Sequence, residues 1–150
     1  MRVLGYDVNS TLIEKNFGTL SNSLSGNVTM VSANTFYNGG SLTLGVGTWL
    51  LVGVATVQSV NASAMRVTVK LWNGTTVASS SEQTCPSMGT SIKGLVSISL
   101  VGVVTIPSGT ETWRMSATAT IANYILLGAT QDNGAGNNAN TLMAFQISDG

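Results

Sequence analysis

The feature that most constrains the fold is the alternation of apolar and polar residues in short segments across residues 41–147. Segment 64–72 shows it clearly, with Met65, Val67 and Val69 on one side and polar residues between them. Side chains of a β-strand point alternately to its two faces, so this period of two predicts strands buried on one face. Gly, Asn and Ser separate the segments, as turns between strands require. The sequence therefore predicts an all-β protein.

The number of such segments predicts the architecture. About eight to ten strands at this spacing are typical of a two-sheet antiparallel sandwich or jelly roll. Segment 49–57 is apolar at nearly every position, which indicates a strand covered on both faces, by the core on one side and by a neighbouring subunit on the other. We expect residues 1–26 to form an N-terminal arm or docking segment and residues 27–150 to form the jelly-roll domain.

Local signals predict the connections between strands. The Asn73–Gly74 dipeptide is the strongest hairpin signal in the chain. We expect residues 80–90 to form the longest loop, with Cys85 in it, and Gly102 to mark a bulge or bend within the apolar run 95–106. Cys85 is the only cysteine, so no disulfide is expected within the chain.

Residues 1–26 differ from the rest of the chain. They hold four of the 12 charged residues and lack sustained alternation. Ile13, Phe17, Leu20 and Leu24 are spaced four, three and four residues apart, which is the a/d spacing of a coiled coil. Two heptads rich in Asn, Gly and Ser are a weak helix signal, so an arm or a peripheral strand is the alternative. In either form, these four apolar residues are the candidates for docking onto a partner.

Charge narrows the range of partners. Six basic and six acidic residues give a formal net charge of zero, so no basic stripe is available for nucleic acid. Only 8% of the residues are charged and 43% are hydrophobic, which favours a surface covered by copies of the chain or by a larger assembly. An uncharged, Ser/Thr-rich extracellular domain is the alternative. No signal peptide is evident, and residues 49–57 are too few to cross a bilayer as a helix.

Catalytic chemistry has little support in the sequence. The chain has no histidine and its six carboxylates are scattered, so we expect no His-based triad, no enzyme activity and no cofactor. The loop Asp132–Asn138 offers oxygen atoms, but it lacks the spaced carboxylates of a dedicated calcium loop. Tight turns use the same residues, so we expect no metal there.

The tryptophans suggest a contact surface. Trp49 and Trp113 fall on faces assigned to apolar packing, whereas Trp72 lies on the polar side of its strand with Arg66 and Lys70. An aromatic ring beside cations and a turn can contact a sugar or another ligand. We therefore take Arg66, Lys70, Trp72 and Asn73 as the possible ligand contacts.

Four segments carry a family resemblance. GTWLLVGVATVQ, KLWNGTTVASS, TWRMSATAT and the late stretch DNGAGNNANTLMAFQI resemble the C1q/TNF-like jelly-roll domains of tailed-bacteriophage virion proteins. The resemblance covers residues 27–150. It implies a homotrimer in which one sheet of each subunit faces the threefold axis. The apolar segment then supplies the candidate trimer interface: Trp49, Leu50, Leu51, Val52 and Val54.

The resemblance also implies a function. We expect a non-enzymatic virion structural protein on the particle exterior, either a trimeric capsid decoration or a short head-fibre protein. It would be made in the host cytoplasm and docked onto another virion protein, such as a capsid or tail component. The alternative is the receptor- or glycan-binding tip of a tail fibre, with a host-surface glycan as partner. Only 26 residues precede the domain, which favours the first expectation over a long fibre. Nucleic-acid binding and membrane insertion are not expected.

Overall fold

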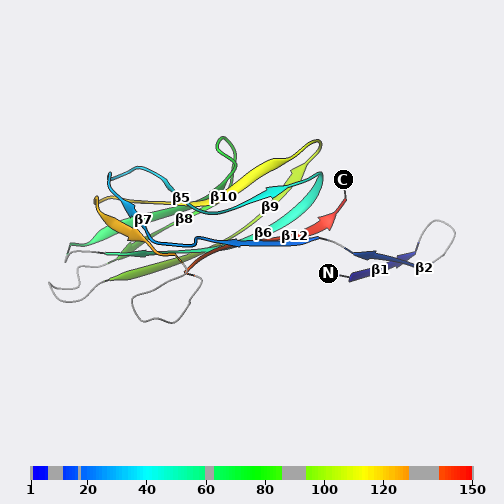
Figure 1. Cartoon of the computed structure of the whole chain (residues 1–150), viewed down its shortest axis with the longest axis horizontal. Coiled ribbons are helices and arrows are strands. Elements are labelled where there is room, and N and C mark those ends of the chain that lie inside the picture. Colours follow the sequence, from blue (N-terminus) through cyan, green and yellow to red (C-terminus); the bar gives the residue numbers. More distant parts are fainter. Residues whose placement is uncertain are drawn as a thin grey trace.

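The computed structural model describes residues 2–6, 12–16, 18–59, 63–85, 94–128 and 139–149. These residues contain strands and no helix, which confirms the predicted all-β class (Figure 1). The strands are β1 (Arg2–Tyr6), β2 (Leu12–Asn16), β3 (Thr19–Ser23), β4 (Val28–Met30), β5 (Tyr37–Leu44), β6 (Gly47–Gln58), β7 (Met65–Trp72), β8 (Val77–Cys85), β9 (Leu95–Ile106), β10 (Glu111–Ala119), β11 (Tyr124–Leu126) and β12 (Asn140–Ser148).

Two antiparallel sheets face each other, so the predicted sandwich is confirmed (Figure 1). One sheet has the order β5-β10-β7-β8. The other is centred on β6, which pairs with β9 along one side and with β12 and then β11 along the other. The edge strands β3 and β4 extend this sheet beyond β12 and β11. From β5 to β10 the chain crosses between the two sheets at each connection except the β7–β8 hairpin, which lies within one sheet.

The core lies between the sheets and follows the alternation of the sequence. On β7, Met65, Val67, Val69 and Leu71 are buried, while the residues between them face outward. On β10, the residues that face the core start at Trp113. Burying apolar surface between two sheets is the main stabilising contribution for a sandwich of this kind.

A buried amide connects the two sheets at one edge. Asn140, at the start of β12, is almost fully buried, and its Oδ1 accepts a hydrogen bond from the backbone N–H of Gly40 on β5 at 3.1 Å. Its backbone carbonyl accepts from the N–H of Leu24 at 3.0 Å. A Cβ at Gly39 would overlap the Asn140 side chain. Glycine at position 39 therefore leaves room for the hydrogen bond between Gly40 and Asn140 inside the sandwich.

Two predicted connections are wrong. Residues 80–85 are not a loop, because β8 continues through them and ends at the buried Cys85, which pairs with Met65. Gly102 is not at a bulge, since β6 and β9 pair without a register shift. A Cβ on Gly102 would lie 3.0 Å from the Cβ of Ala78 on β8. The glycine lets the two sheets approach closely where β8 meets β9.

The N-terminal residues divide into two parts. β1 and β2 pair with each other as a hairpin that lies apart from the sandwich at the end where β12 finishes (Figure 1). β3 instead pairs with β12 and forms an edge of the β6 sheet. The boundary that we predicted between residues 1–26 and 27–150 therefore has one strand of the sandwich on its N-terminal side. Residues 12–16 and 19–23 form strands, so the helical alternative is wrong for these residues.

Candidate functional site

The sheet centred on β6 has an outer face with unusual chemistry. None of its strands, β3, β4, β6, β9, β11 and β12, contains an Asp, Glu, Lys or Arg residue. The charged residues of the sandwich strands all belong to the other sheet. A solvated sheet face normally carries charged side chains. An uncharged outer face of this width therefore marks a candidate interaction surface.

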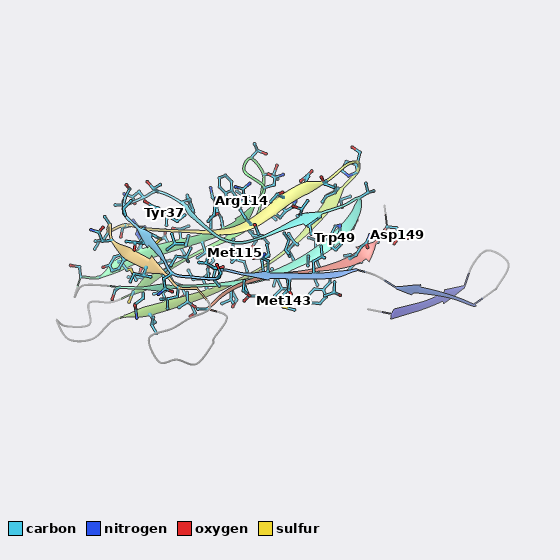
Figure 2. The ribbon with its side chains drawn as sticks, in the orientation of Figure 1. Tyr37, Trp49, Arg114, Met115, Met143 and Asp149 are labelled. Carbon is cyan, nitrogen blue, oxygen red and sulfur yellow. The ribbon has the colours of Figure 1, made fainter. Side chains whose placement is uncertain are left out.

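Apolar side chains form two rows across this outer face. Strand register sets them side by side as Val101–Val52–Met143 and Val103–Leu50–Phe145. Several are well exposed: Val103 is 59%, Val101 58% and Met143 37% exposed, and Leu95 further along β9 is 53% exposed. Figure 2 shows Met143 and Arg114 on opposite sides of the sandwich with Met115 between the layers. A shallow depression of about 120 Å³ lies beside Val52, Val54 and Met143.

The five predicted interface residues divide between the two faces of β6. Leu50, Val52 and Val54 are partly exposed on the outer face. Trp49 and Leu51 are buried in the core, where the indole Nε1 of Trp49 donates to the carbonyl of Gly45 at 3.0 Å. A strand with period two can present only alternate residues to one partner, so Leu50, Val52 and Val54 remain the predicted interface residues on β6. β9 and β12 supply the remaining residues of the face, which the sequence analysis did not name.

A second cluster lies on the outer face of the β5-β10-β7-β8 sheet. It contains Lys70 and Trp72 from the predicted contact set, together with Phe36. The ammonium of Lys70 lies 3.2 Å from the ring centroid of Trp72 and 3.9 Å from that of Phe36. The indole Nε1 of Trp72 donates to the hydroxyl of Ser116 at 2.8 Å. Cation–π contacts and this hydrogen bond hold the two side chains against the sheet.

Two cations of this face, Lys70 and Arg66, differ in their electrostatic surroundings. Burial lowers the pKa of Lys70 below its ordinary value, because desolvation disfavours the charged form. Arg66 instead forms an exposed ion pair with Glu82 at 3.1 Å, and Glu82 also accepts from the hydroxyl of Thr68. Arg66 therefore lies on the predicted face, but its charge is already balanced by a neighbour.

Asn73 lies away from this cluster. Its Oδ1 accepts from the backbone N–H groups of Thr75 and Thr76 in the β7–β8 turn. Its Nδ2 donates to the Glu111 carboxylate at 2.9 Å, and the indole of Trp113 donates to the same oxygen at 3.1 Å. These contacts stabilise the predicted hairpin, so the structure gives Asn73 a role in the turn.

Glu111 also lines a cavity of about 420 Å³ between β8 and β9. Its walls combine polar and apolar side chains: Asn73, Thr76, Thr105, Val77, Ala78, Val103, Val104 and Trp113. Glu82 lies on the outer face with Arg66, whereas Glu111 lies at this opening. The two carboxylates therefore occupy separate environments and do not form a pair that acts on one substrate.

The predicted docking residues are placed as follows. Ile13 lies on β2, and Phe17 falls outside the described residues. Leu20, on the edge strand β3, is 38% exposed, while Leu24 packs against the core. Leu24 thus has a structural role, and the detached hairpin and Leu20 remain the predicted docking elements.

Phe36 and Arg114 belong to the cluster around Trp72 but were not predicted from the sequence. Phe36 lies in the connection before β5, and Arg114 lies directly opposite Trp72 on the neighbouring strand β10. The alternation of β10 placed Arg114 on a polar face. No local signal pairs β10 with β7, however, because their partnership depends on the topology of the whole sandwich.

The described residues carry no signal of a metal site or of a membrane-spanning helix. No group of three or more His, Cys, Asp or Glu side chains there could hold a metal ion. The loop Asp132–Asn138 lies outside those residues. The same part of the chain contains no helix long and apolar enough to cross a lipid bilayer.

Comparison with known sequences identifies no relative. No protein-family model matches the chain, and no curated protein has significant similarity to it.

Some solved structures are similar to this chain, at low identity and with TM-scores below 0.5. Eiger TNF from S. frugiperda is 12% identical, with a TM-score of 0.46 over 91% of this chain and 96% of that chain. A structure of the infectious bursal disease virus Gx strain is 10% identical, with a TM-score of 0.42 over 98% of this chain. A subviral particle of VP2 from that virus is 14% identical, with a TM-score of 0.36 over 97% of this chain. The chain spans 42% of each viral chain.

Proposed function

We propose that this chain is a non-enzymatic, self-associating structural protein that assembles through the outer face of the β6 sheet. The observation that carries the proposal is the absence of charge from all the strands of that sheet, combined with two exposed apolar rows at its centre. At about 25 cal/mol per Å² of buried apolar surface, covering such a face with another subunit is favourable. The occupant is a second and third copy of the same chain, in a closed homotrimer.

We further propose that the trimer lies on the exterior of a tailed-phage virion, as a capsid decoration or a short head fibre. The four segments that resemble C1q/TNF-like virion domains support this location. The detached β1–β2 hairpin supports it as well, because an element outside the sandwich is available to bind a capsid or tail protein. In this proposal the sandwich forms the trimer, and the N-terminal hairpin attaches it to the particle.

Immunogold electron microscopy of intact particles tests the location. Antibodies raised against the purified chain are applied to virions from a culture that expresses it. Gold on the capsid surface is the expected result, and gold confined to the tail tip favours the alternative below. Particles that carry the chain by mass spectrometry but show no gold before disruption would contradict an exterior location.

The alternative function is a receptor- or glycan-binding tip. The partly buried cluster of Lys70, Trp72 and Phe36 favours it, because aromatic rings and a cation gather on one sheet face. Loss of glycan-array binding in Trp72→Ala, with an unchanged circular dichroism spectrum, would support this function over a purely structural role.

A further inference from the structure

The outer face of the β5-β10-β7-β8 sheet carries an excess of positive charge. Its described cations are Arg66, Lys70 and Arg114, and its one described carboxylate is Glu82. Glu82 is paired with Arg66. Lys70 and Arg114 therefore have no acidic partner among the described residues, although the chain as a whole has no net charge.

Lys70 is held in place without a counter-ion. Two aromatic rings, Trp72 and Phe36, contact its ammonium group, and their centroids are 6.4 Å apart. An ammonium group has three N–H donors, and ring faces satisfy them less well than an anion does. The rings thus restrict the flexible side chain in advance, which lowers the entropic cost of binding an anionic group.

Arg114 provides an independent observation. Its Nε–H is buried and has no hydrogen-bond partner within the described part of the chain. Its guanidinium carbon lies 6.0 Å from the ring centroid of Trp72. The Nε–H itself is out of reach of a ligand, but Arg114 as a whole is only partly buried, and its charge has no acidic partner among the described residues. Guanidinium groups match the geometry of carboxylate and sulfate oxygens.

Strand register brings the two cations to one site. Arg114 is directly opposite Trp72, and Ser116 is directly opposite Lys70, so Lys70 and Arg114 are diagonal neighbours on adjacent strands. Diagonal neighbours are about 7–8 Å apart at the backbone, within reach of long side chains. Trp72 lies between them and is fixed by Ser116, whose hydroxyl in turn donates to Asn38 at 2.7 Å.

We propose that Lys70 and Arg114 together bind a carboxylate or sulfate group of an acidic polysaccharide. The surroundings favour a sugar chain over a free inorganic anion. Exposed hydroxyl groups flank the two cations, with Ser80 opposite Lys70 and Ser41 opposite Arg114, and they can hydrogen-bond sugar hydroxyls. A sheet face has room for an extended polymer along its strands. The inference deepens the glycan-binding alternative and rests on it.

Isothermal titration calorimetry with the full-length protein tests this site. The probes are oligogalacturonate for carboxylate, dextran sulfate for sulfate, neutral dextran and single-stranded DNA. We expect binding to one or both acidic saccharides that weakens as salt is added. Lys70→Gln and Arg114→Gln should each lower the affinity by about 10-fold, since each removes a charge-assisted hydrogen bond. The preferred acidic saccharide identifies the anionic group.

Two further variants make the result specific. Arg66→Gln removes a cation from the same face, but one already paired with Glu82, so it should change the affinity less than about 2-fold. Lys70→Arg keeps the charge and should retain most of the binding if Lys70→Gln fails only through lost charge. All variants should keep the oligomeric mass of the natural chain, because this face is opposite the proposed assembly face. Failure here is thus distinguishable from failure of self-association.

Several outcomes would overturn the site. One is no binding to either acidic saccharide. Another is equal loss of affinity in Arg66→Gln and Arg114→Gln, which would indicate general surface charge. A third is equal or tighter binding of single-stranded DNA, which would indicate a nucleic-acid surface. Equal binding of neutral dextran would show that the cations do not select the ligand.

Discussion

At the scale of single residues, a few polar side chains determine how the two sheets meet. Asn140 is buried at the edge of the core and satisfies the N–H of Gly40 across the sandwich. Its own Nδ2 has no partner in the described residues. A polar group buried in this way stabilises the fold only through the hydrogen bond that it completes. The contact therefore specifies how β5 is positioned against β12.

Asn140→Ala should destabilise the protein. The substitution leaves the buried N–H of Gly40 unpaired and opens a space above Gly39. We expect the free energy of unfolding in urea to fall by about 1–3 kcal/mol. Thr84→Ala, at an exposed position of β8, is the control and should change it by less than about 0.5 kcal/mol. Equal values for the two variants would show that the Asn140 contact is not stabilising.

Residue patterns predicted some contacts and missed others for a physical reason. Lys70 and Trp72 were identified because their strand alternates cleanly, so one strand alone shows which residues point outward. Arg114 and Phe36 join them only through the pairing of β10 with β7 and the path of the chain before β5. Contacts between strands depend on long-range topology, which one segment does not encode.

At the scale of strands, the predictable elements are those with a strong apolar face. β7 matched the predicted alternation, with Val67 and Val69 in the core. On β10, Ser116 and Thr118 between the core residues are buried as well. β3 and most of β8 are rich in Ser and Thr and have few buried residues. Backbone pairing with β12 and β7 makes them strands. Edge strands of this kind have little sequence signal, because only one side of them is paired.

N-terminal deletions separate the roles of the hairpin and of β3. Removing residues 1–16 should leave a folded assembly with an unchanged circular dichroism spectrum, since β1 and β2 pair with each other. It should also abolish incorporation into particles if the hairpin is the docking element. Removing residues 1–23 also deletes β3, with its five paired residues and the Ser23–Thr141 hydrogen bond. That deletion should lower stability by a further ~2 kcal/mol.

A different result would contradict each of the two deletion predictions. Particle incorporation by the protein lacking residues 1–16 would place the docking surface on the sandwich. Equal unfolding midpoints for the two proteins would show that β3 contributes nothing to the stability of the β6 sheet.

At the scale of the whole molecule, the two sheets differ in the charge that their strands carry. One sheet carries no charged residue in its strands, and the other carries all the charged residues of the sandwich strands. Random placement of surface residues would not separate charge so completely between two faces. We interpret the uncharged face as the side that meets other subunits, and the charged face as the side that meets solvent or a ligand.

Val101→Asp tests the assembly face without disturbing the core. Val101 is 58% exposed in the single chain, so a carboxylate there should be tolerated by the fold. In the assembly it would be buried against another subunit, where an unpaired charge is strongly unfavourable. We expect a folded monomer by circular dichroism and light scattering. Thr84→Asp, an exposed change on the other sheet, should leave the assembly intact. An unchanged assembly mass for Val101→Asp would show that the interface lies elsewhere on the protein.

The mass of the natural protein in solution tests the central claim most directly. Sedimentation equilibrium at micromolar concentration measures it independently of molecular shape. The account predicts a single species with three times the 15.4 kDa mass of one chain. A monodisperse species of 15.4 kDa at that concentration would contradict it, because the uncharged face of the β6 sheet would then be stable in water without a partner.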